Sequence, residues 1–194
     1  YLGLLAYVIY QALPAQRENA TLAKIGPYFL LNCAANSAWI FAWHYELMLL
    51  SLFLMLVILG SLVRIYRILG IAKGPASTGR RLLVHLPFSI YTGWITVATI
   101  ANISAVQTAW DWNSLGLEPV SWTLVKLAIA GAIGAQVVVR RGDVAFVLVV
   151  AWAAFGIVAG QAAIPEVAGA AAVIGLTGLL LAGAEVAGKL LARN

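Results

Sequence analysis

The sequence is poor in the residues from which polar active sites are built. It holds one cysteine, two histidines and seven acidic residues in 194, and only 10% of its residues are charged. The single cysteine, Cys33, excludes a disulfide within these residues. No Ser-His-Asp set, no cluster with metal-ligand spacing and no glycine-rich phosphate loop after a strand can be found. The sequence therefore predicts a protein that is not an enzyme.

Apolar side chains are what the chain has in excess. Hydrophobic residues make up 63% of it, and its mean hydropathy is +0.95. A water-soluble domain of this size cannot cover so much apolar surface, so the composition predicts an integral membrane protein. A net charge of +5 can indicate nucleic-acid binding. Here the basic residues lie between long apolar runs, where they set membrane topology, and we expect no nucleic acid as a partner.

The apolar runs predict an all-α fold, a polytopic bundle of membrane helices. A helix needs about 20 apolar residues to cross a bilayer. Seven segments separated by short loops rich in proline, glycine and charge fit this pattern: residues 1–13, 27–43, 47–69, 82–110, 120–139, 144–161 and 167–191. The first is too short to span, and the chain opens on Tyr1 without an initiator methionine. We therefore expect further sequence upstream.

Charge predicts the orientation of these helices, because lysine and arginine are retained on the cytoplasmic side of a membrane. One set of loops and the C-terminal tail hold nearly all the basic residues: Arg17, Lys24, Arg64, Arg67, Lys73, Arg80, Arg81, Arg140, Arg141, Lys189 and Arg193. The alternate loops hold acidic residues instead: Glu46, Asp111, Glu118 and Glu166. The C-terminus is therefore predicted to be cytoplasmic. Lys126 breaks the pattern, and it would either counter a ligand carboxylate or extend its stem to the interface.

Two of the predicted helices carry a stripe of amide and aromatic side chains. In segment 27–43 the spacing i, i+4, i+7, i+11 places four residues on one face: Asn32, Asn36, Trp39 and Trp43. Segment 82–110 has a similar stripe at the spacing i, i+4, i+7, i+11, i+15, formed by Pro87, Tyr91, Trp94, Ala98 and Asn102. Amides facing lipid would lose their hydrogen bonds at a cost of several kcal/mol, so both stripes should face the bundle interior. Two interpretations stay open, since the amides can join helices or line a ligand cavity.

The remaining features are less specific. His85 and His44 are weak candidates for ligating haem iron or a chlorophyll magnesium, although a lone histidine at a membrane boundary is more often solvated. The last three segments are rich in small residues, with Gly156 and Gly160 forming a G-x3-G pair. Residues 120–191 thus predict a scaffold, or a docking face for a second copy or a larger membrane complex. That complex would be photosynthetic or respiratory, with this chain as an accessory subunit.

The two stripes resemble a known family. "ANSAWIFAW" is similar to the LNxxWSxLFF helix of the TspO/MBR family, the tryptophan-rich sensory and translocator proteins, with Asn36 and Trp39 at the Asn and Trp. Asn32 stands where that family usually has Gln. "LPFSIYTGWITVATIAN" is similar to its last helix, PYLxWVxFAxxLN. The Pro-to-Trp distance is three residues longer here, which leaves open whether Tyr91 or Trp94 takes the ring position.

The resemblance covers residues 1–110 and implies a division of the chain. "YLGLLAYVIYQ" would be the tail of the WTxLYxxMG helix, with Tyr1 as its Tyr, and the family's first helix would precede it. Residues 111–194 would form a C-terminal extension of three helices. The resemblance implies a site for a flat apolar ligand such as haem or another porphyrin, used in sensing or transport. Its predicted residues are Asn32, Asn36, Trp39, Tyr91, Trp94, Ala98 and Asn102.

Overall fold

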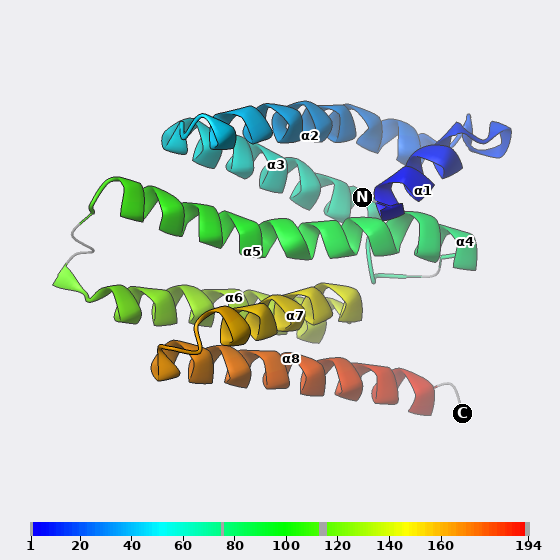
Figure 1. The fold of residues 1–194 in the computed structure, drawn as a ribbon. Coiled ribbons are helices and arrows are strands. Elements are labelled where there is room, and N and C mark those ends of the chain that lie inside the picture. The colour runs from blue at the N-terminus through cyan, green and yellow to red at the C-terminus, as the bar shows by residue number, and fades with distance from the viewer. Residues whose placement is uncertain (1, 75, 113–115, 193–194) are drawn as a thin grey trace. The chain divides into compact units, whose positions relative to one another are not determined.

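All seven predicted segments are helices in the computed structural model, which describes residues 2–74, 76–112 and 116–192. Tyr1 and Arg193 lie outside the described residues. The main helices, labelled in Figure 1, are α1 (Leu2–Ala12), α2 (Ala20–His44), α3 (Met48–Leu69), α5 (Leu86–Ala109), α6 (Pro119–Arg141), α7 (Val144–Gly160) and α8 (Pro165–Leu191). The described residues contain no strand, so the all-α prediction is confirmed.

Within the described residues, four helical stretches are long and apolar enough to cross a membrane: Met48–Leu69, Thr78–Ala109, Pro119–Arg141 and Pro165–Leu191. The helices α1 and α7 are apolar but shorter. With 17 residues, α7 is roughly 25 Å long, somewhat less than the ~30 Å hydrocarbon core. The helix α2 is long enough at 25 residues, but its amides lower its hydropathy. The polar stripe therefore makes α2 less apolar than the four stretches named above.

The start of α2 differs from the sequence-based prediction. The helix begins at Ala20, seven residues before the expected start at position 27. Asn19 is the reason, because its side-chain oxygen accepts from the backbone N–H groups of Thr21 and Leu22 and so caps the first turn. Pro27 is tolerated inside the helix. Lys24, which we predicted in a loop, therefore lies on α2.

The helix that holds the second stripe also begins earlier than expected. The loop predicted between segments 47–69 and 82–110 ends at Ser77, which caps the short α4 (Thr78–Arg80) by accepting from the backbone N–H of Arg80. A π-helical turn, η2 (Arg81–His85), connects α4 to α5. Pro87 follows directly and has no N–H for the regular ladder, and its ring would clash with the carbonyl four residues earlier. The widened turn accommodates this proline without ending the helix.

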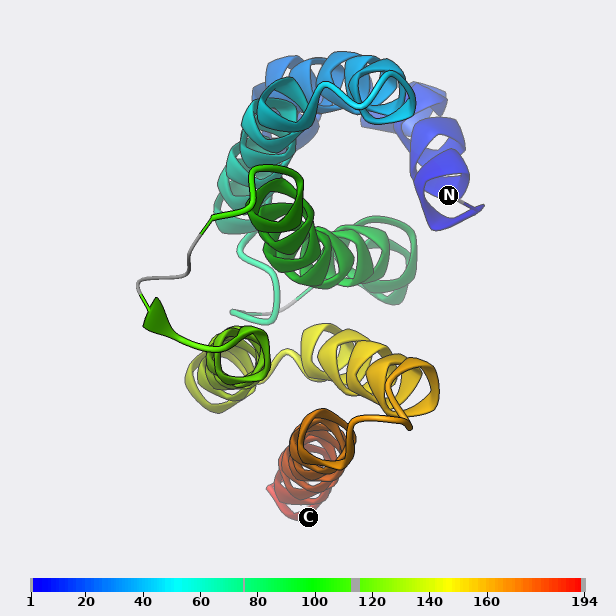
Figure 2. The ribbon, with the colours of Figure 1, turned by 60° about the vertical axis from the view of Figure 1, so that its left-hand side comes forward.

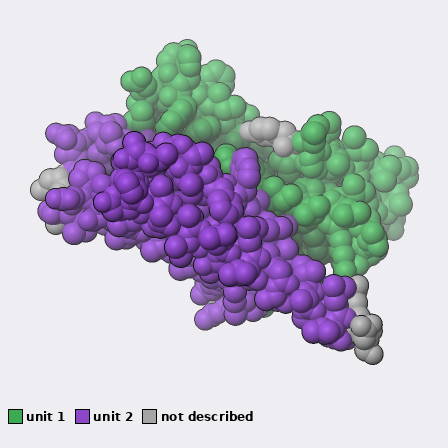
Figure 3. All heavy atoms as spheres, turned by 60° about the horizontal axis from the view of Figure 1, so that its bottom comes forward, with its two compact units in different colours: residues 1–95 green, residues 96–194 purple. Residues whose placement is uncertain are grey.

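The chain forms two compact units, residues 1–95 and 96–194, coloured in Figure 3. Their boundary lies inside α5. The sequence-based division into residues 1–110 and a C-terminal extension of three helices stays a prediction.

In the first unit α2 and α3 lie side by side along their length (Figure 2). Three rings join α1, α2 and the start of α5. Tyr7 contacts Phe29 and Phe88 edge to face at centroid distances of 5.1 and 4.8 Å, and Phe29 and Phe88 are 5.8 Å apart. Gly3 allows α1 to approach α5, since a Cβ at this position would lie 3.2 Å from the Cβ of Pro87. These rings form the aromatic core of the unit.

In the second unit α6, α7 and α8 each pack against the other two. Small residues permit this, as predicted: Gly178 of α8 faces Ala151 of α7 so closely that an added Cβ would lie 3.1 Å from the alanine Cβ. Glu185 and Lys189 form an ion pair one turn apart on α8, at 3.1 Å. Lys189 Nζ also donates to the carbonyl oxygen of Gly142 at 2.7 Å, which ties α8 to the end of α6.

Lys126 has a partner that the sequence did not suggest. Its Nζ donates to Gln107 Oε1 at 3.0 Å, a hydrogen bond between α6 and the second half of α5. Both residues belong to the second unit. A charged group that is partly buried gains from such a polar partner, so this lysine joins two helices.

The surface is apolar, as expected of a protein whose solvent is lipid. Many large hydrophobic side chains are exposed on every main helix, among them Leu30, Phe41, Phe53, Leu180 and Leu191. A water-soluble monomer does not expose apolar area so continuously. The exposure follows from the composition, because too few polar residues exist to cover the helices.

Candidate ligand-binding site

Asn32 begins the stripe on α2, and it is held by the neighbouring helix. Its side chain is only 1% exposed. Its Nδ2 donates to the carbonyl oxygen of Ile58 at 3.1 Å and to Ser61 Oγ at 2.9 Å, both on α3. Ser61 Oγ in turn donates to the same carbonyl at 2.7 Å. These bonds join α2 to α3, which is the helix-joining interpretation, and the role of Asn32 toward a ligand stays a prediction.

One turn further along, Asn36 and Trp39 are in a different situation. Both side chains are partly buried. The Asn36 amide has no hydrogen-bond partner within the described part of the chain. Trp39 Nε1 is buried and likewise unpartnered there. Residues three apart on a helix share a face, so a free amide and a free indole N–H lie close together on α2.

Trp43 extends this surface. Its ring stacks on that of Trp39 with centroids 5.6 Å apart and an interplanar angle of 23°. Trp43 is 41% exposed. Together the two indoles form an aromatic stack beside the polar groups of Asn36 and Trp39. Flat apolar rings stack well on such a surface.

The second predicted stripe lies along α5. Tyr91 and Ala98 are partly buried, Trp94 is 44% exposed and Asn102 is 3% exposed. Tyr91 and Trp94 belong to the first unit, whereas Ala98 and Asn102 belong to the second. The helical spacing of these four residues is as predicted, and their part in a ligand site stays a prediction.

The two histidines are far apart in the chain and occupy different settings. His85 is partly buried in η2, and His44 is exposed at the end of α2 with its ring 5.2 Å from that of Tyr45. No group of three or more His, Cys, Asp or Glu side chains that could hold a metal ion occurs in the described ranges. A role of either histidine as a single axial ligand stays a prediction.

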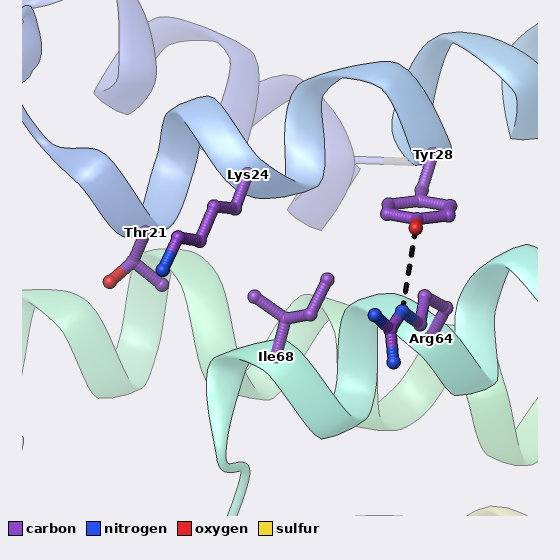
Figure 4. A pocket seen from close by; sticks show the side chains of 5 residues that line it. All are labelled: Thr21, Lys24, Tyr28, Arg64 and Ile68. Carbon is purple, nitrogen blue, oxygen red and sulfur yellow. Dashed lines mark hydrogen bonds between the residues drawn. The ribbon is translucent and has the colours of Figure 1, made fainter.

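Sequence reasoning missed a polar groove between α2 and α3. It has a volume of about 480 Å³ and is lined by Thr21, Lys24, Tyr28, Arg64 and Ile68 (Figure 4). We assigned its two cations to loops, which concealed that they line one groove from two neighbouring helices. The signal was present in the spacing, because Thr21, Lys24 and Tyr28 stand at i, i+3 and i+7 and Arg64 and Ile68 at i and i+4.

Comparison with family models shows the family of this chain. A family model described as "TSPO-like protein" matches residues 1–184. No curated protein and no solved structure matches the chain. The family match extends beyond residue 110, so the helices α6 and α7 and most of α8 lie inside it. The suspected resemblance to the TspO family is thereby confirmed, with a wider coverage than the motifs alone suggested.

Proposed function

Because the chain belongs to the TSPO-like family, we propose that this integral membrane protein binds a flat apolar ligand of the tetrapyrrole class, such as haem or another porphyrin, and serves in sensing or transport. No catalytic role is part of the proposal. A chlorophyll-type ring fits the same chemistry. The family match and the apolar helices support the membrane assignment. The proposal of a tetrapyrrole ligand is based on the residues of α2.

The observation that carries the proposal is the pair of unpartnered polar groups on α2. The indole N–H of Trp39 is buried without an acceptor in the described residues. Leaving such a donor unpaired in an apolar setting costs about 1–3 kcal/mol. A tetrapyrrole has a flat apolar ring for the Trp39–Trp43 stack, and carboxylates at its edge that accept hydrogen bonds. Asn36 would bind the same polar edge.

The test is a titration of the purified chain with haem and with protoporphyrin, followed by tryptophan fluorescence and by the Soret band. We expect saturable binding by the wild type. Trp39→Phe removes the N–H and keeps a ring, and Asn36→Leu removes the amide and keeps the volume. Each should weaken binding by about tenfold, since one good polar or aromatic contact contributes about 1.4 kcal/mol.

Trp152→Phe on α7 is the matched control, because it makes the same substitution at a tryptophan that is 65% exposed and outside the stripe. It should leave both dissociation constants unchanged. Absence of saturable binding, or equal affinity in Trp39→Phe, Asn36→Leu and wild type, would refute the proposal.

We also propose a second candidate, an accessory or structural role through the small-residue face of α7. A Cβ added at Gly156 or Gly160 would meet no atom within 4 Å. Both glycines are exposed one turn apart on an apolar helix, an arrangement that allows another helix to approach closely. A second copy of the chain or a larger membrane complex would fit here.

This candidate predicts that Gly156→Leu/Gly160→Leu separates association from folding. The two leucines project from exposed positions where a Cβ meets no atom of the chain within 4 Å. The melting temperature should therefore stay near that of the wild type. A dimer or larger assembly of the wild type, measured by light scattering in detergent, should dissociate in the double variant. A wild type that is monomeric in lipid nanodiscs and in detergent would contradict self-association.

A further inference from the structure

The groove between α2 and α3 gathers positive charge without a counter-ion. Lys24 and Arg64 both line it, and none of its five lining side chains is acidic. Neither cation forms an ion pair within residues 2–74, 76–112 and 116–192. Glu18, the acidic residue nearest to Lys24 in sequence, is exposed in the connection before α2. Two unpaired cations that line one groove repel each other, and a bound anion offsets that repulsion.

Arg64 is oriented toward the groove by Tyr28. Its Nε donates to the Tyr28 hydroxyl oxygen at 3.4 Å, and its guanidinium carbon lies 5.8 Å from the centre of the tyrosine ring. Figure 4 shows this contact reaching from α2 to α3. Because Nε is engaged, the terminal Nη groups remain as donors. A guanidinium presented in this way matches the oxygens of a phosphate.

The groove combines this charge with apolar surface. Ile68 lies between the side chains of Lys24 and Arg64 in Figure 4, and Thr21 lies beside Lys24. Further along the same two helices, away from the groove, leucine and phenylalanine side chains are exposed. A volume of about 480 Å³ is in the range of small-ligand pockets. An amphiphile with an anionic head and apolar chains meets both kinds of surface.

The expected membrane position of the groove agrees with such an occupant. Its residues come from the first turns of α2 and the last turns of α3. Positive charges at this end of the helices predict the cytoplasmic side, where anionic lipids are concentrated. Basic pockets between membrane helices on that side are typical sites for lipid headgroups.

We propose that this groove binds the headgroup phosphate of an anionic phospholipid, held by Lys24 and Arg64. Tyr28 is a positioning residue that orients the guanidinium. Ile68 contacts the first methylene groups of the lipid. The site is separate from the proposed tetrapyrrole surface at Asn36 and Trp39, and it does not depend on that proposal.

The experiment is a lipid titration of the full chain in detergent, with bound lipid counted by native mass spectrometry. The probes are phosphatidylglycerol and zwitterionic phosphatidylcholine with the same acyl chains. We expect wild type to bind phosphatidylglycerol more tightly. Lys24→Gln/Arg64→Gln should weaken that binding by about 30-fold, from roughly fivefold for each cation near a membrane surface, and leave phosphatidylcholine binding unchanged.

The matched control is Lys73→Gln/Arg140→Gln, which removes two exposed cations that do not line the groove. It should bind phosphatidylglycerol as the wild type does. Arg64→Lys and Tyr28→Phe should each give an intermediate loss, because one keeps the charge without the Nε hydrogen bond and the other removes its acceptor. These single variants also serve if the double variant does not fold.

A competition arm separates lipid from free phosphate. Excess inorganic phosphate should not displace phosphatidylglycerol, and its displacement of the lipid would assign the groove to a soluble phosphate. Equal binding of the two lipids by wild type, or an equal loss in the control variant, would overturn the proposal. Trp39→Phe should bind phosphatidylglycerol with wild-type affinity, because Trp39 does not line the groove. The lipid result therefore stands or falls independently of the tetrapyrrole proposal.

Discussion

Phe88→Ala is expected to lower the free energy of unfolding by about 3 kcal/mol. The Phe88 ring is fully buried and makes edge-to-face contacts with Tyr7 of α1 and Phe29 of α2. In a membrane the loss comes from packing and from the cavity, because lipid tails are as apolar as the ring itself. Unfolding by sodium dodecyl sulfate in mixed micelles, followed by circular dichroism, measures the change.

Phe53→Ala is the control for this loss of a ring. Phe53 is 62% exposed on α3, so its removal leaves no cavity and should change the free energy of unfolding by less than about 0.5 kcal/mol. Equal losses in the two variants would show that α1, α2 and α5 do not depend on the aromatic core. A larger loss in Phe88→Ala would support the packing of Tyr7, Phe29 and Phe88.

Gly178→Leu should destabilise the second unit by about 2–3 kcal/mol through overpacking. Gly178 is buried on α8, and an added Cβ would lie 3.1 Å from the Cβ of Ala151 and 3.6 Å from the carbonyl oxygen of Val147. Both neighbours are close to the backbone of α7, which is 2% exposed or less at these residues. Neither can move aside as the end of a long side chain would, so α7 and α8 must separate.

Gly183→Leu provides the matched comparison on the same helix. A Cβ at this glycine meets no atom within 4 Å, so leucine should be neutral or slightly stabilising through its helix propensity. Sodium dodecyl sulfate unfolding and the melting temperature are the two measurements. A neutral Gly178→Leu would mean that α7 and α8 do not pack at the distance described.

The order and type of the helices followed from local sequence patterns, while their ends depended on single residues. Apolar runs predicted seven helices, and all seven are present. The helices predicted to start at residues 27 and 82 begin earlier, because the side chains of Asn19 and Ser77 cap the chain at residues 20 and 78. The π-turn before Pro87 was not predicted either. A cap or a proline acts through a few hydrogen bonds, which a hydropathy average does not detect.

The candidate site was predicted as a set of residues on a helix face, without their partners. Periodicity placed Asn32, Asn36 and Trp39 on one side of α2. It could not distinguish Asn32, which is bonded to α3, from Asn36 and Trp39, whose polar groups have no partner in the described residues. The three residues share one face of the helix, and what distinguishes them is a partner on a neighbouring helix, about 26 residues further along the chain.

Composition and apolar runs were enough to predict a helical membrane protein, and two short motifs carried its resemblance to the TspO family, because each of these depends on residues close together in the chain. The packed helices were needed to show that Lys24 and Arg64 line one groove, that Lys126 binds Gln107 and that Gly178 must be small. Each of these features pairs helices through residues distant in sequence. Such pairings arise from the packing of whole helices, and no local pattern of charge or hydropathy specifies them.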